Sequence, residues 1–161
     1  IRRRVVMKFY ELPDTLTAEE DVFEKDIADF VSGKINPIKF KAIRVAHGVY
    51  EQRQEDTYMI RIRCAAGGIT PRQLKKVAEL GEKYGNGEVH FTTRQEVQVH
   101  NVLIHEVMNV IRGLREVDLS SRGGGGNTIR NILTSPDSGT AKDEAFDVDP
   151  YEDCINYAFN F

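Results

Sequence analysis

A stretch near the middle of the chain, Glu88 to His100, carries side chains that suit the binding of an anion. In an extended segment every second side chain points to the same face. One such set is polar throughout: Glu88, His90, Thr92, Arg94, Glu96, Gln98 and His100. Imidazole, guanidinium, amide and hydroxyl groups can together donate several hydrogen bonds to one multidentate anion. Taken alone, the stretch also fits an ordinary solvated strand face, so its interpretation depends on the neighbouring elements.

The other set of side chains in this stretch predicts how the polar set is positioned. It is apolar at both ends and polar in the middle. Alternation of this kind is typical of a strand with one face on a core. Because residues 93–95 interrupt the apolar row, we predict two short strands, about 88–92 and 96–101, joined by a kink or bulge.

An earlier segment, Tyr58 to Cys64, is predicted to be a strand with two arginines on one face. Arg61 and Arg63 are two positions apart, which places them about 7 Å apart on the same sheet surface. Like charges at that distance repel unless acids or a bound anion neutralise them. An anion site and a pair of surface salt bridges are both consistent with this pattern.

The N-terminal part of the chain has the pattern of a helix that packs on a core. A capping box from Thr17 to Glu20 and a stop at Gly33 predict a helix over residues 18–32. Residues 40–50 mix basic and apolar side chains, and we expect them to be irregular or to form a first strand.

Two further helices are expected around the central strands. Thr70 as N-cap, Pro71 at the first helical position and Gln73 two residues later predict a helix that ends near Gly85. Apolar residues at helical spacing predict another helix over about 104–115.

The order of these elements predicts an α+β fold. From residue 57 it is strand, helix, two strands and helix, and an extended segment near 117–121 would complete a ferredoxin-like split β-α-β unit. We therefore expect an antiparallel sheet with helices on one face, an N-terminal helix and a C-terminal extension. The polar sets of the strands would then converge on the uncovered face.

The run Gly123 to Gly126, followed by Asn127 and Thr128, predicts a loop whose amides wrap anionic oxygens and lead into a helix. It lacks the lysine of a nucleotide phosphate loop. A flexible linker is the alternative interpretation.

Composition and cysteine content narrow the functional classes. A net charge of −3 gives no general reason to expect nucleic acid as a partner, and no apolar run approaches the length of a membrane span. Cys64 and Cys154 lie far apart in sequence, so neither a disulfide framework nor a metal site built by this chain alone is supported. We expect Cys64 to be a buried structural thiol, and two lone cysteines indicate a cytoplasmic location.

Three segments together resemble the N-terminal half of the sirohaem-dependent sulfite and nitrite reductases. They are Met59 to Thr70, Phe91 to His100 with its Thr-Arg-Gln-x-x-Gln-x-His run, and Gly126 to Ile132, and the resemblance covers about residues 40–140. It implies an oxidoreductase that reduces sulfite to sulfide, or nitrite to ammonia, in a six-electron reaction. The implied cofactors are sirohaem and a coupled 4Fe-4S cluster.

The resemblance also implies a domain division and roles for single residues. Residues 1–39 would be a lead-in and helix, 40–121 the ferredoxin-like half-domain, and 122–161 the truncated start of the sirohaem and iron–sulfur domain. Arg61 and Arg130 would bind the substrate anion as catalytic residues. The implied cofactor-binding residues are Arg63, Thr92, Arg94, Gln98, His100, Asn127 and Asn131, and no metal ligand is expected in this chain.

The sequence departs from the family in the part that would hold the cluster. The cluster cysteine motifs and two active-site lysines of the family are absent, so the chain is expected to be inactive without the remainder of the reductase or a partner subunit. An electron donor, a ferredoxin or a flavoprotein, is a further implied partner. Sulfite and nitrite both remain open as substrates. The alternative from another class is a non-catalytic ferredoxin-like module that binds an anionic ligand or a protein partner.

Overall fold

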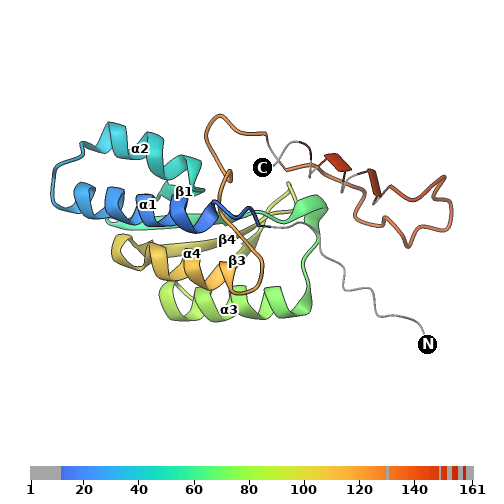
Figure 1. Cartoon of the computed structure of the whole chain (residues 1–161). Coiled ribbons are helices and arrows are strands. Elements are labelled where there is room, and N and C mark those ends of the chain that lie inside the picture. Colours follow the sequence, from blue (N-terminus) through green and yellow to red (C-terminus); the bar gives the residue numbers. More distant parts are fainter. Residues whose placement is uncertain (1–11, 130, 149, 152–153, 156–157, 159–161) are drawn as a thin grey trace.

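The computed structural model describes residues 12–129, 131–148, 150–151, 154–155 and 158. Four helices and a four-stranded sheet form its folded part (Figure 1). The elements in order are α1 (Leu16–Val31), α2 (Pro37–Ala46), β1 (Val49–Glu51), β2 (Thr57–Ile62), the 3-10 turn Ala65–Gly67, α3 (Pro71–Tyr84), β3 (Val89–Phe91), β4 (Val97–Leu103), the 3-10 turn Ile104–Glu106 and α4 (Val107–Arg115). Residues 1–11 of the predicted lead-in lie outside the described residues.

The sheet is antiparallel and has the strand order β1-β2-β4-β3. Alternate residues of the central strands, such as Ile60 on β2 and Val99 on β4, are fully buried against apolar side chains of the helices. The intervening residues of the same strands point to the other side of the sheet and form its polar face. The predicted α+β ferredoxin-like sheet, with helices on one face, is therefore confirmed.

Helix caps were predicted correctly for α3 and only in part for α1. The Thr70 hydroxyl accepts from the Gln73 amide, while the Gln73 side chain accepts from the Thr70 amide, which is the predicted capping box. Helix α1 instead has Thr15 at its N-cap, so the prediction of Thr17 was wrong. The helix ends at Val31 with Ser32 as its C-cap, and Gly33 follows with a φ of 77°, as predicted.

Residues 37–46 form a helix, and the prediction of an irregular segment or strand there was wrong. The Asn36 side chain accepts a hydrogen bond from the Lys39 amide at 2.9 Å, and Pro37 occupies the first turn. Asn36 and Pro37 therefore start α2, because proline's missing N–H costs nothing at that position.

Strands β3 and β4 are joined by a reversal of the chain, not by a kink within one direction. β3 and β4 pair antiparallel, with Val89 opposite Val99 and Phe91 opposite Val97. The Thr92 amide donates to the Glu96 carbonyl, and Gln95 takes a left-handed conformation with a φ of 57°. The predicted strands are correct, but they form a hairpin with a turn at residues 92–96.

The edge of the sheet next to β2 differs from the prediction. No strand forms at residues 117–121 in the described structure, and β1 occupies that edge instead. Beyond the end of β1, the Ser120 carbonyl accepts from the Arg63 amide at 3.0 Å, so the expected segment still borders β2 at one point.

Ion pairs tie helix α1 to the segments that follow the sheet. Arg115 of α4 contacts the buried carboxylate of Glu20 at 2.6 Å. The Glu19 carboxylate accepts from the guanidinium of Arg122, directly before the glycine run. Helix α1 therefore fixes the point at which the chain leaves α4 and returns to the sheet.

After Gly126 the described chain forms no helix before residue 148, so the expected helix N-terminus behind the glycine run was wrong. Figure 1 shows the orange and red part of this segment extending beyond one end of the sheet. Within the described residues, no helix has the length and apolar character needed to cross a membrane.

Candidate anion-binding face

The polar face of the sheet brings together residues that the sequence places on separate segments. Arg61 on β2 lies directly opposite Gln98 on β4, and Gln98 lies opposite His90 on β3. Directly paired residues of antiparallel strands share a face. We call the uncovered side of the sheet around these residues the open face.

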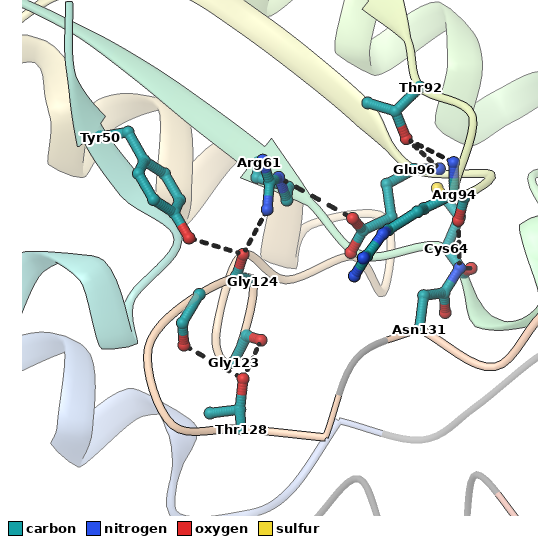
Figure 2. Close-up of polar contacts among 11 residues, drawn as sticks. Tyr50, Arg61, Cys64, Thr92, Arg94, Glu96, Gly123, Gly124, Thr128 and Asn131 are labelled. Carbon is teal, nitrogen blue, oxygen red and sulfur yellow. Dashed lines mark hydrogen bonds and ion pairs between the residues drawn. The ribbon is translucent and has the colours of Figure 1, made fainter.

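Arg61 is held at the open face by contacts on several sides (Figure 2). Its Nη1 donates to the Gly124 carbonyl at 3.2 Å, and its guanidinium lies 4.9 Å from the centre of the Tyr50 ring. Its Nε lies 3.8 Å from a carboxylate oxygen of Glu96 and is buried without a hydrogen-bond partner. The predicted substrate-binding arginine is thus ordered, with a side chain still 21% exposed.

Arg63 is almost fully buried, with a relative exposure of 6%. Its Nη1 would lie only 2.8 Å from a Cβ built on Gly123, so the guanidinium fills the space that this glycine leaves. Glu96, 5% exposed, lies on the same face and supplies negative charge near Arg61. The charge of Arg61 is therefore partly neutralised within the chain.

The hairpin turn positions Thr92 and Arg94 differently. The Thr92 hydroxyl accepts from the amides of Arg94 and Glu96 at 3.2 and 3.1 Å, so it stabilises the turn. The Arg94 side chain is exposed, and its guanidinium has no hydrogen-bond partner among the described residues. Arg94 is consequently the cation of the turn that is available to a ligand.

His100 and His90 lie at one side of the open face with their rings edge to face and 6.0 Å apart. They border a cavity of about 510 Å³, together with Asn86, Glu88 and Asn101 among others. Burial lowers the pKa of His100, and the neighbouring His90 lowers it further. Nδ1 of His100 also lies 3.1 Å from the Gln52 amide nitrogen, so the ring is held in place at this side of the open face.

Asn131 connects the C-terminal segment to the turn and to the end of β2. Its amide nitrogen donates to the carbonyls of Cys64 at 2.8 Å and Arg94 at 3.0 Å, and its Oδ1 is buried without a partner. Asn127 is exposed. Arg130, the second predicted substrate-binding residue, lies outside the described residues.

The glycine run packs closely against the sheet edge, and this explains its composition. A Cβ at Gly125 would lie 2.0 Å from the Tyr50 hydroxyl, and one at Gly124 would lie 3.0 Å from the Arg61 carbonyl. The amides of Gly123 and Gly124 donate to the carbonyls of Ala46 and Ser121. These two amides are therefore occupied within the chain and are not available to an anion, whereas anion binding by the rest of the run stays a prediction.

Two residues of the open face were not predicted as site residues. Tyr50 lay in a segment expected to be irregular or to form a first strand, and Glu96 appeared only as one member of the polar set. The signal that could have found Tyr50 is its position two residues after Gly48, at the start of the edge strand β1.

Cys64 is a buried thiol, as predicted, with a relative exposure of 1%. Burial raises its pKa to about 12, and the charge of Glu96 acts in the same direction. Because the thiolate is the form that reacts and binds metals, Cys64 has neither role at neutral pH. Nowhere in the described part of the chain do three or more His, Cys, Asp or Glu side chains gather as a metal site.

This state of Cys64 can be tested by alkylation. At pH 8 we expect iodoacetamide to modify the exposed Cys154 in the folded chain and to leave Cys64 unmodified. Cys64 should react only after unfolding in denaturant, as peptide mass spectrometry would show. Equal rates at both cysteines in the folded chain would contradict the assignment.

Comparison with known proteins identifies relatives for most of the described chain. Residues 50–117 match the nitrite/sulfite reductase ferredoxin-like half domain. The hemoprotein beta-component of an NADPH sulfite reductase from Thiocapsa roseopersicina is 32% identical over 126 residues, which cover 70% of this chain and 22% of that protein. An assimilatory ferredoxin-dependent nitrite reductase from Haloferax mediterranei is 35% identical over 118 residues, covering 66% and 20% respectively.

A solved structure supports the fold. The Mycobacterium tuberculosis NirA protein aligns with a TM-score of 0.74 and 22% identity, over 86% of this chain and 29% of that one. The chain spans about a fifth of the length of the two sequence relatives above.

Proposed function

The chain belongs to the family of nitrite and sulfite reductases, and we propose that it supplies part of the sirohaem site and of the substrate site in such an enzyme. The observation that carries this proposal is the convergence of polar side chains on one face of the sheet, where the part-exposed Arg61 and His100 lie beside the buried Arg63 and Gln98, bordered by the exposed Arg94 in the hairpin turn. In the proposed division, 1–39 is the lead-in, 40–121 the half-domain and 122–161 the start of the next domain.

The residues of the open face fit a cofactor with many carboxylates, as sirohaem has. Guanidinium, imidazole and amide donors are the groups that hold carboxylates, and a planar guanidinium can bind one with two hydrogen bonds. The buried Nε of Arg61 has no hydrogen-bond partner, and the Arg94 guanidinium has none among the described residues. Among the described residues, Glu96 is the carboxylate that pairs with Arg61, at 3.8 Å from its Nε.

We assign the binding roles as follows. Arg94, Gln98 and His100 hold carboxylates of the sirohaem, with Arg63 behind them and Thr92 fixing the turn. Asn131 supports the loop that closes on the turn, and Asn127 contributes from the same segment. When bound, the sirohaem with its 4Fe-4S cluster supplies the electrons of the six-electron reduction.

Arg61 and Arg130 are proposed to bind the substrate, sulfite or nitrite. A guanidinium beside an oxyanion stabilises the negative charge that develops on oxygen as it is lost as water. Both anions offer oxygens to the same donors, and the named relatives include reductases of both kinds. A ferredoxin or a flavoprotein is the proposed electron donor.

We also propose that the chain is inactive without the rest of its reductase. A 4Fe-4S cluster takes four thiolate ligands, whereas this chain has two cysteines, one of them buried and protonated. The cluster ligands would come from the remainder of the enzyme or from a partner subunit.

The decisive experiment is an absorption spectrum of the complete protein that contains this chain, purified anaerobically, with iron and acid-labile sulfide assays. We expect sirohaem bands and about four further irons per chain, as a 4Fe-4S cluster requires. A colourless, iron-free protein that takes up no cofactor when sirohaem is supplied would overturn the proposal. It would favour the alternative, a binding module that holds an anionic ligand at the open face.

A further inference from the structure

Arg61 lies on the central strand β2. On the open face it has two diagonal neighbours, Tyr50 on strand β1 and Glu96 in the turn before strand β4. Tyr50 on β1 is opposite Met59, two residues before Arg61. Glu96 is two residues before Gln98, which is opposite Arg61 on β4. Long side chains in such diagonal positions reach one another across a sheet.

Tyr50 holds one side of the arginine. The Arg61 guanidinium lies over the Tyr50 ring at 4.9 Å, a distance at which the ring attracts a cation. The Tyr50 hydroxyl also donates to the Gly124 carbonyl at 3.4 Å, the same oxygen that accepts from Arg61 Nη1. Tyr50 therefore connects the arginine to the glycine run (Figure 2).

Glu96 holds the other side by charge. Its carboxylate oxygen lies 3.8 Å from Arg61 Nε, which exceeds hydrogen-bond distance, and the carboxylate is 5% exposed. A pair separated from water in this way is weakly screened. Glu96 thus balances part of the positive charge of the open face and attracts the Nε side of Arg61.

We propose that Tyr50 and Glu96 are positioning residues that fix the Arg61 guanidinium before an anion arrives. This inference rests on the proposed function of Arg61 as a substrate contact. A free arginine side chain loses rotamer freedom when it binds, and a side chain already fixed loses less, so fixing it strengthens anion binding and aligns the anion for reaction. Tyr50 acts through its ring, and Glu96 acts through its charge.

The two residues should give different kinetic signatures in the complete enzyme. Tyr50→Leu removes the ring and should lower kcat/KM for the anion by roughly tenfold, mainly through a higher KM. Tyr50→Phe keeps the ring and should restore values close to those of the unchanged enzyme. Glu96→Gln keeps the shape but removes the charge, so kcat should fall while KM does not rise.

Matched controls come from the far side of the molecule. Tyr84→Leu removes the ring that lies beside Lys83 on α3, and Glu79→Gln removes an exposed carboxylate paired with Lys75. Neither should change kcat or KM. Sirohaem content and thermal unfolding, measured for every variant, separate a positioning effect from a loss of fold.

Combining each variant with Arg61→Ala distinguishes a wrong inference about Tyr50 and Glu96 from a wrong assignment of Arg61 as a substrate contact. If Tyr50→Leu and Glu96→Gln have no further effect on kcat/KM once Arg61 is alanine, they act through Arg61, as proposed. If their effects add fully to that of Arg61→Ala, the inference is wrong although Arg61 still contacts the anion. If Arg61→Ala changes neither kcat nor KM in a cofactor-loaded enzyme, the proposed role of Arg61 is itself wrong, and the inference fails with it.

Discussion

Replacing Gly48 with alanine is expected to destabilise the fold by about 3 kcal/mol or more. Gly48 has a φ of 71°, a left-handed conformation that a side chain disfavours by roughly 1–2 kcal/mol. A Cβ there would lie 2.4 Å from the Ser121 carbonyl oxygen and 2.9 Å from the Arg61 carbonyl oxygen. Both atoms belong to the backbone, so relief requires the sheet edge and the glycine run to separate.

Gly33→Ala is the matched control for this substitution. Gly33 also has a left-handed conformation, with a φ of 77°, but a Cβ there would meet no atom within 4 Å. We expect it to cost only the conformational part, about 1 kcal/mol. Urea unfolding of both variants measures the change in the free energy of unfolding. If both variants lose the same free energy, the glycine run does not pack tightly against Gly48.

Gly48→Ala should also disturb the open face. The Arg61 carbonyl and the segment beginning at Ser121 meet at Gly48, and Arg61 donates to Gly124 in that segment. Any enzyme that remains folded should therefore show a higher KM for its anion, whereas the Gly33 variant should not.

Arg94→Ala and Arg61→Ala in the complete protein are expected to have separate effects. Arg94 is exposed in the hairpin turn, and losing it should lower the fraction of protein that carries sirohaem. Arg61→Ala should leave that fraction high and lower kcat/KM for the anion about a hundredfold, as loss of a charge-assisted hydrogen bond to a reacting group does. Arg130→Ala should resemble Arg61→Ala.

The measurement is sirohaem content from absorption, followed by steady-state reduction of sulfite and nitrite by the loaded fraction. Arg72→Ala, which removes an exposed arginine of α3 that donates to the Glu116 carbonyl, is the control and should change neither quantity. The division of roles would be wrong if the Arg94 and Arg61 variants had equal sirohaem content and equal activity.

Elements with local signals could be predicted from the amino-acid sequence. Thr70, Pro71 and Gln73 specify the start of α3 because a helix cap is closed by hydrogen bonds between residues three apart. The alternation around Arg61 specified which side chains of β2 face the core, and the apolar spacing specified the face of α4 that is buried. Family-specific segments around the same residues then indicated the reductase family.

Which segments pack against one another could not be read from local patterns in the sequence. The turn at residues 92–96 reverses the chain, and β1 takes the edge beside β2, because strand pairing depends on contacts between distant residues. The same contacts place Tyr50, Glu96 and the glycine run around Arg61, where no short-range pattern could put them. Local hydrogen bonds and periodicity fix elements, whereas a site assembled from several strands exists only once those strands are paired.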